Sequence, residues 1–237
     1  MPKLIFDIET IGEDWSEMDE TTQKALTSWL KKEAYSDESY ALALDNIKSG
    51  LGFSPYTGEV VAIGVLEAET NKGAVYFQAP DSGIKDFEAD GIKYRVLTEK
   101  AMLANFWQGA IEYSEFISYN GRGFDVPFLM LRSAINEVRP TKDLMSNRYL
   151  NSQKFNAQHI DLMDQLTFYG AVQRRPKLHI VCRAFGIKSP KEDGVDGDEV
   201  KPLFVAKEYE KIARYNAADL RATRELYFKW EKFINIK

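Results

Sequence analysis

The sequence predicts an α/β domain in which one mixed β-sheet is flanked by helices. The order of the elements is the first observation, because three strand-like segments come first and strand-like and helix-like segments then alternate. Size is the second, since 237 residues, 44% of them hydrophobic, suffice for one substantial core. We therefore expect a single domain over residues 1–237.

Five segments have the composition of β-strands. Runs rich in Ile, Val, Phe and Tyr that end at turn residues are typical of strands. They occupy residues 4–9, 60–68, 74–79, 116–120 and 158–162. The turn sequences SPYTGE and TNKG separate the first three segments, which predicts an antiparallel meander.

The helix-like segments have apolar residues at helical spacing. They occupy residues 97–114, 126–138, 162–170, 177–187 and 207–234. A long excursion, residues 13–56, separates the first strand from the second, and its residues 20–34 are helix-like. Excursions of this length are usually functional or mobile. We expect a helical insertion at 13–56 beside the functional site.

The composition excludes several classes of protein. No apolar run has transmembrane length, and the N-terminus lacks the basic-then-apolar layout of a signal peptide. The single cysteine, Cys182, excludes an intramolecular disulfide framework. These features predict a cytoplasmic protein that does not bind membranes. The net charge of −5 argues against nucleic-acid binding through the whole surface, although a local site remains compatible with it.

Two acidic residues interrupt an apolar strand near the N-terminus. In LIFDIET, Asp7 and Glu9 are two residues apart and therefore point to the same face of the strand. Neighbouring buried carboxylates repel each other and lose hydration. A hard cation such as Mg²⁺ would offset this cost, because it binds carboxylate oxygens. The pair therefore predicts a metal site at the C-terminal end of the strand, where α/β sheets place their ligands.

Two later segments contain further acidic residues, and each has an ordinary structural explanation when taken alone. In SYNGRGFDVPFL, Asp125 precedes a predicted helix and fits an N-cap, while Asn120 fits a turn. In ARYNAADLRATREL, Tyr215 and Asp219 are four residues apart and share one helix face. A core-facing tyrosine and a solvated aspartate would explain that spacing equally well.

Together, FDIET, NGRGFDVPFL and Y-x-x-x-D resemble the three motifs of the DEDD superfamily of 3′–5′ exonucleases, which shares the ribonuclease H-like fold. The tyrosine is similar to that of the tyrosine subgroup; the histidine subgroup has a His where this chain has Arg214. Closer still, residues 3–230 resemble the predicted 3′–5′ exonucleases related to the proofreading domain of family B DNA polymerases. The resemblance implies five catalytic residues: Asp7, Glu9, Asp125, Tyr215 and Asp219.

The resemblance also implies a cofactor and a reaction. Two divalent metal ions, Mg²⁺ with Mn²⁺ as a possible substitute, would be bound by the four acids, with Asp7 bridging both ions and Asp125 acting through water. Tyr215 would orient the attacking water, since an unperturbed tyrosine pKa near 10 makes the side chain a poor base. The implied reaction hydrolyses phosphodiester bonds at 3′ ends of single-stranded nucleic acid, with DNA favoured, and releases nucleoside monophosphates.

Candidates for substrate binding are Thr10, Asn120, Phe124, Arg174, Arg175 and Lys177. The basic residues would contact backbone phosphates, with a solvated helix face as the competing interpretation. Phe124 would stack on a terminal base, with core packing as the competing interpretation. Asp161 and Asp164 match an acidic position of the family, but a helix N-terminus explains them as well.

Two alternative functions remain open at this point. One is a catalytically inactive exonuclease-like module that binds nucleic acid or a partner, and the other is an exonuclease that prefers short RNA. Retention of all four acids and Tyr215 favours an active enzyme. No polymerase domain is expected within these residues, so any proofreading would require a separate polymerase or repair partner.

Overall fold

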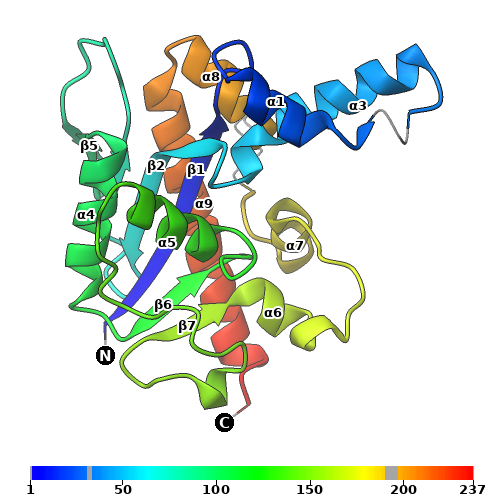
Figure 1. Cartoon of the computed structure of the whole chain (residues 1–237). Coiled ribbons are helices and arrows are strands. Elements are labelled where there is room, and N and C mark those ends of the chain that lie inside the picture. The colour runs from blue at the N-terminus through cyan, green and yellow to red at the C-terminus, as the bar shows by residue number, and fades with distance from the viewer. Residues whose placement is uncertain (1, 31–33, 190–196, 237) are drawn as a thin grey trace.

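A computed structural model describes residues 2–30, 34–189 and 197–236, and it has a seven-stranded sheet with helices on both faces (Figure 1). The strands are β1 (Lys3–Gly12), β2 (Gly58–Glu67), β3 (Gly73–Phe77), β4 (Phe87–Ala89), β5 (Ile92–Val96), β6 (Glu115–Ser118) and β7 (Gln158–Asp161). Their spatial order is β4-β5-β3-β2-β1-β6-β7. The prediction of an α/β fold with one mixed sheet is confirmed.

The pairing of the strands makes β1 the centre of the site. β1, β2 and β3 form the predicted antiparallel meander. β6 pairs with β1 in parallel, and β7 pairs with β6 in parallel. A crossover connection joins β1 to β6, so the C-terminal ends of these strands meet on one edge, as ligand sites in α/β sheets require.

The end of the first strand was predicted too early. β1 continues past residue 9 to Gly12, with a bulge between Glu9 and Thr10, because β2 stays paired with it as far as Gly58. On its other side, β1 pairs with β6 only from Lys3 to Ile5. Asp7 and Glu9 are therefore inside the strand but beyond its parallel partner, where one edge of β1 is open.

A hairpin of β4 and β5 was also missed by the sequence analysis. Asp90 and Gly91 have φ angles of 52° and 77°, as a two-residue hairpin turn of type I′ requires. β5 then pairs in parallel with β3 and extends the sheet at the edge away from the site.

Helices cover the two faces of the sheet. α4 (Glu99–Ala110) and α5 (Asp125–Ile135) pack on one face, where Leu4, Phe6 and Ile8 of β1 share their core. α9 (Tyr209–Phe233) packs on the other face, with α7 (Leu178–Phe185) and α8 (Val200–Val205) beside it. α6 (Leu162–Leu166) follows β7 directly. Because side chains of a strand alternate, Asp7 and Glu9 point to the α9 face.

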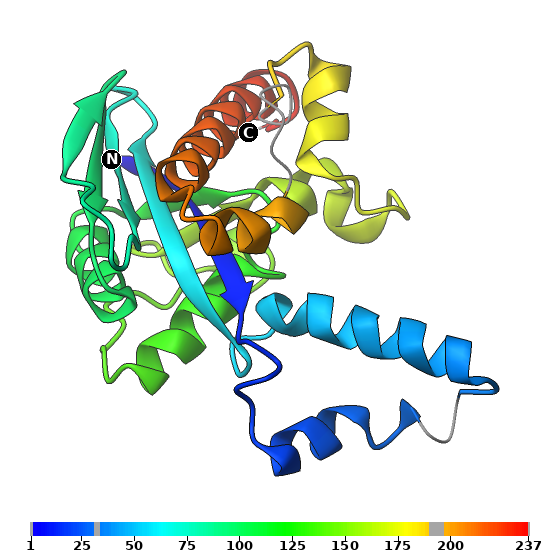
Figure 2. The same ribbon diagram turned by 90° about the horizontal axis from the view of Figure 1, so that it is seen from above.

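The excursion after β1 forms an arm, defined here as residues 13–56. It contains α1 (Glu20–Thr27) and α3 (Asp37–Gly50), which project from the body (Figure 2). Neither helix has a buried residue. α3 was not predicted from the sequence, and residues 31–33 of the helix expected at 20–34 lie outside the described residues. The chain returns to the body through the short helix η1 (Leu51–Phe53).

None of the helices in the described part of the chain is both long enough and apolar enough to span a lipid bilayer.

Candidate active site

Three of the predicted acids come together on the α9 face of the sheet. Asp7, Glu9 and Asp219 each place one carboxylate oxygen within 4.8 Å of the others. β1 supplies the first two, and α9 supplies the third from a position more than 200 residues later in the chain. Glu9 and Asp219 are buried, and Asp7 is half-buried.

Asp125 lies beside this group and is also buried. It is the first residue of α5, and the N-cap residue is Phe124, which makes no side-chain cap. Asp125 Oδ1 instead accepts a hydrogen bond from Ile8 N of β1, at 3.1 Å. The side chain therefore ties α5 to the strand that carries the other acids, and the N-cap interpretation is wrong.

The four carboxylates carry an electrostatic cost. Burial raises the pKa of Asp7 well above its usual range, and the charges of Asp125, Asp219 and Glu9 raise it further. Burial, with the charge of Asp219, raises the pKa of Glu9 in the same way. Burial also raises the pKa of Asp125 to about 7, although the hydrogen bond from Ile8 opposes this shift. The protein lowers the charge of this cluster only by holding protons or by binding cations.

Asn216 is a site residue that the sequence analysis missed. It is fully buried on α9, one residue after Tyr215, and its Nδ2 donates a hydrogen bond to Asp7 Oδ2 at 2.8 Å. Its Oδ1 has no hydrogen-bond partner among the described residues. Only the folded arrangement of α9 against β1 reveals this contact, so no local sequence signal would have found it.

The contact of Asn216 depends on a glycine in β2. Gly64 pairs directly with Asp7. A Cβ atom added at Gly64 would overlap Asn216 Oδ1 and would lie 2.7 Å from Leu220 Cδ1. Glycine at this position therefore lets α9 approach the sheet closely enough for Asn216 to reach Asp7.

Tyr215 is half-buried and lines a cleft together with Asp219, as their spacing on one helix face predicted. Burial raises the pKa of its hydroxyl, and the nearby charges of Asp219, Glu9 and Asp7 raise it further. The raised pKa favours the protonated hydroxyl, which can donate a hydrogen bond. Arg214 faces elsewhere, because it pairs with Glu210 and lies over the Phe87 ring.

The cleft has a volume of about 490 Å³. Among the substrate-binding candidates, Asn120, Arg175 and Lys177 line it. Thr10, Phe124 and Arg174 do not line it. Asn120 has a φ angle of 64°, so the turn interpretation of this residue is correct as well.

An aromatic residue at the root of the arm also lines the cleft. Phe53 in η1 is 62% exposed and makes an edge contact with Phe124 at a centroid distance of 6.3 Å. Phe124 is half-buried and packs on Phe128. Thr10 Oγ1 donates to the carbonyl of Gly52 at 2.7 Å and so fixes η1 to β1. Of these two phenylalanines, Phe53 is therefore the one that lines the cleft.

Two other predicted residues have structural partners. Asp161 Oδ1 caps α6 by accepting from Met163 N at 3.0 Å. Asp164 pairs with Arg148 through both carboxylate oxygens. The helix N-terminus thus explains Asp161, as the sequence analysis allowed. Cys182 is a buried free thiol, which agrees with a packing role.

The donor set of the cluster fits a divalent cation. Mg²⁺ and Mn²⁺ prefer carboxylate oxygens, and three such oxygens converge at distances that one ion can bridge. A bound cation would also remove the repulsion that raises the pKa of Asp7 and Glu9.

Comparison with known sequences gives the family. Residues 57–235 match the family described as predicted 3′–5′ exonucleases related to the exonuclease domain of PolB. The chain belongs to this family. The matched region includes Asp125, Tyr215 and Asp219, whereas Asp7 and Glu9 precede it and join them through the fold. No curated protein matches the chain.

Comparison with solved structures supports the fold. The family B DNA polymerase from the hyperthermophilic archaeon Pyrobaculum calidifontis matches 97% of this chain, with a TM-score of 0.54 and 20% sequence identity. The match covers 24% of that polymerase chain, so this protein spans about a quarter of the polymerase's length. The similarity shows that this member of the family has a ribonuclease H-like α/β fold.

Proposed function

We propose that the protein is a metal-dependent 3′–5′ exonuclease of the tyrosine subgroup that hydrolyses single-stranded nucleic acid, DNA in preference to RNA, to nucleoside monophosphates. The convergence of Asp7, Glu9 and Asp219, with Asp125 beside them, carries the proposal. Family membership supports nuclease chemistry. The half-buried Tyr215 beside Asp219 supports the subgroup.

Each residue of the cluster has a role in this proposal. Asp7, Glu9 and Asp219 would bind one divalent cation, and Asp7 and Asp125 would bind a second. When bound, the two ions would activate water and neutralise charge on the leaving 3′ oxygen. Asn216 holds the Asp7 carboxylate in place, and Tyr215, with its proton retained, orients the attacking water.

The walls of the cleft would hold the 3′-terminal nucleotide. Lys177 and Arg175 supply positive charge for phosphates, and Asn120 supplies an amide for hydrogen bonding. Phe53 would stack on the terminal base, in place of the predicted Phe124, because its ring is the more exposed of the two. Location in the cytoplasm stays a prediction from the sequence.

Digestion of end-labelled oligonucleotides tests the proposal. Single-stranded DNA and RNA carrying a label at either the 3′ or the 5′ end are incubated with Mg²⁺, with Mn²⁺ or with EDTA. We expect labelled mononucleotide to appear first from the 3′-labelled DNA, more slowly from RNA, and not at all in EDTA. Asp219→Asn serves as the control for contaminating nucleases and should be inactive.

Four results would contradict the proposal. Undiminished cleavage in EDTA would remove the metal mechanism, and early release of a 5′ label as mononucleotide would remove the polarity. Faster digestion of short RNA would transfer the substrate preference to RNA. Binding of oligonucleotides without cleavage under every metal condition would identify an inactive binding module.

A further inference from the structure

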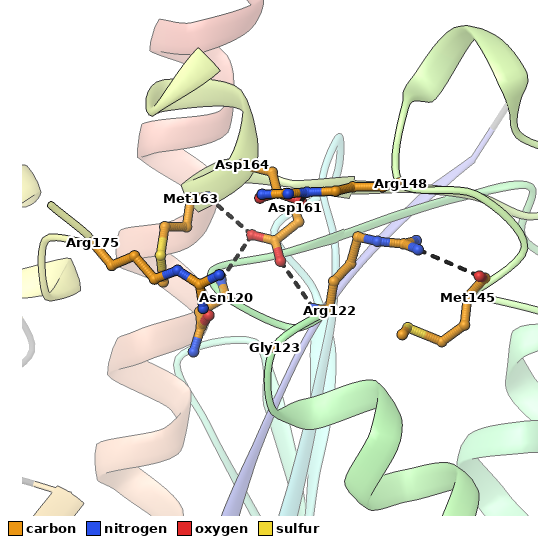
Figure 3. A pocket seen from close by; sticks show the side chains of 9 residues that line it. All are labelled: Asn120, Arg122, Gly123, Met145, Arg148, Asp161, Met163, Asp164 and Arg175. Atoms are coloured by element: carbon orange, nitrogen blue, oxygen red, sulfur yellow. Dashed lines mark hydrogen bonds and ion pairs between the residues drawn. The ribbon is translucent and has the colours of Figure 1, made fainter. Parts of the chain in front are cut away.

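A second cavity of about 210 Å³ adjoins the cleft (Figure 3). The two share Asn120, Met163 and Arg175, so they are direct neighbours. None of the four clustered acids lines the second cavity. Three arginines line it: Arg122, Arg148 and Arg175. We call it the arginine cavity.

The arginine side chains are held in place without using all their donors. Arg122 donates to the carbonyls of Leu144 and Met145, at 2.9 and 3.4 Å. Arg148 donates twice to Asp164. A guanidinium has five N–H donors, so each of these two arginines keeps three. Arg175 makes no hydrogen bond or ion pair with any residue that the structure describes. All five N–H donors of its guanidinium are therefore available.

Two carboxylates also line the arginine cavity, and each already has hydrogen-bond or ion-pair partners within the protein. Asp161 accepts hydrogen bonds from the backbone nitrogens of Asn120, Arg122 and Met163, as the dashed lines of Figure 3 show. Asp164 is paired with Arg148. Arg122 and Arg175 thus remain without a carboxylate partner, which leaves the cavity with net positive charge.

The charges around the cleft favour one path for a bound strand. The arm contains nine acidic and four basic residues, so it repels phosphates. The acid cluster, whose Asp219 lines the cleft, repels them too unless cations are bound. The arm helices α1 and α3 leave the body on a different side from α6 (Figures 1 and 2). A phosphodiester chain leaving the cleft meets positive charge in the arginine cavity.

We propose that the arginine cavity is a phosphate-binding subsite for the substrate strand, which holds a phosphodiester group on the 5′ side of the bond to be cut. The proposal rests on the proposed function, since it presupposes that a 3′ end occupies the cleft. Arg175 is the residue shared by cleft and cavity, and it would contact this phosphate directly. Arg122 and Arg148 would contribute donors from fixed positions.

Affinity measurements with Arg175→Gln test the subsite. Binding of single-stranded DNA is measured with Mg²⁺ in the Asp219→Asn background, which prevents cleavage. We expect Arg175→Gln to raise Kd about 10-fold, as for loss of one charged hydrogen bond. The slope of log Kd against log salt concentration should decrease in magnitude by about 0.7, the value for one phosphate contact with a single strand. Arg139→Gln is the matched control, because Arg139 is an exposed arginine that lines neither cavity, and it should change neither quantity.

Neutral linkages locate the contacted phosphate. Oligonucleotides with one methylphosphonate at successive positions from the 3′ end are compared between the parent and Arg175→Gln. One linkage on the 5′ side of the scissile bond should weaken binding to the parent about 10-fold and binding to Arg175→Gln only about twofold, which measures their coupling.

Several outcomes would overturn the proposal. Equal Kd and salt slope in Arg175→Gln and Arg139→Gln would remove the subsite. The same methylphosphonate penalties in the parent and in Arg175→Gln would also remove it. Calorimetry could also show that Arg175→Gln weakens binding of inorganic phosphate but leaves binding of the strand intact. That result would mean that the cavity binds free phosphate instead. Coupling at one linkage in a protein that cleaves under no metal condition would keep the subsite and refute the exonuclease. An unchanged Kd and salt slope in Arg175→Gln, in a protein that cleaves 3′ ends with Mg²⁺, would refute the subsite and keep the exonuclease.

Discussion

At Asp7 the chain accepts an arrangement that a stable fold ordinarily avoids. The carboxylate is surrounded by three other acids, and burial raises its pKa together with their charges. It receives a hydrogen bond from one neutral group, Asn216. If Asp7 binds metal as proposed, Asn216 would orient its carboxylate, as groups behind metal ligands commonly do.

Asn216→Ala should weaken metal binding. Without its donor, the Asp7 carboxylate loses its fixed orientation, and we expect the Kd for Mn²⁺ to rise about 10–100-fold. Titration calorimetry on the purified protein measures this directly. Thr223→Ala, at another buried polar residue of α9, is the control for disturbance of the helix. An unchanged Kd in Asn216→Ala would mean that Asn216 only fills space against Gly64.

Tyr215→Phe should leave the fold intact and lower kcat about 10- to 1000-fold, the range for loss of one positioning hydrogen bond. The raised pKa of Tyr215 means that no ionised form contributes near neutral pH. The change therefore lowers the rate equally at pH 7 and pH 9 in single-turnover digestion. Wild-type rates in this variant would make Tyr215 a packing residue.

His159 predicts a dependence of stability on pH that is separate from the acid cluster. Burial, with the charge of Arg122, lowers its pKa to about 3, whereas the unfolded chain has a value of about 6.5. Between these values the unfolded state binds more protons, so stability is lost as the pH falls from about 6.5 towards 3. In urea unfolding from pH 7 to pH 4.5, His159→Asn should lose less stability than wild type over this range. Parallel pH profiles for the two proteins would refute a neutral buried His159.

At the scale of the elements, η1 connects the arm to the cleft of the candidate active site. Thr10 binds the carbonyl of Gly52, and Gly52 packs so closely on β1 that an added Cβ would lie 2.9 Å from Gly12 N. η1 therefore holds Phe53 over the cleft at a fixed position, even though α1 and α3 bury no residue.

Phe53→Ala should raise KM for single-stranded DNA about 5- to 100-fold with little change in kcat, because stacking on a base contributes about 1–3 kcal/mol to binding. Phe53→Trp should restore KM. The control is Tyr56→Ala, since Tyr56 is an exposed aromatic of the same segment that does not line the cleft. Substrates with an abasic 3′ residue should bind wild type and Phe53→Ala alike. Equal KM values for Phe53→Ala and Tyr56→Ala on normal DNA would exclude stacking.

Local patterns predicted the elements whose signals lie within one segment. β1, β2 and β3 have apolar runs with clear turns between them, and α9 has a long helical repeat. The β4–β5 hairpin was missed although Asp90-Gly91 is a strong hairpin signal, because its strands are short and half-polar. α3 was missed because its segment is largely polar, and in the structure it buries no residue.

The acids of the site were found because their motifs are recognisable in linear order. Asn216, Phe53 and the arginine cavity were not found from the sequence, because the role of each depends on contacts between segments that are distant in the chain. The sequence gives no role to Asn216, which lies between Tyr215 and Asp219. Its role becomes visible only when α9 packs against Gly64. Phe124 was the candidate because it is next to Asp125 in the sequence, and only the structure shows that Phe53 is the more exposed of the two.

At the scale of the whole molecule, negative charge exceeds positive charge, and the arginine cavity is a local exception. The net charge is −5, and the acids of the arm and of the cluster contribute to it. Metal binding would therefore stabilise the fold as well as enable catalysis, since it neutralises buried charge that folding brings together.

Unfolding of wild type and Asp7→Asn, with EDTA and with Mg²⁺, tests the central claim that the cluster is a metal site. The asparagine keeps an oxygen that can accept the hydrogen bond of Asn216 but removes one of four repelling charges. We expect Asp7→Asn to be as stable as wild type in EDTA, or more stable. Mg²⁺ at 100 times its Kd should stabilise wild type by about 2.7 kcal/mol, and the variant should lose most of this increment. A variant that is clearly less stable than wild type in EDTA, yet keeps the full Mg²⁺ increment, would show that Asp7 is a structural residue and that the cluster is not built for metal.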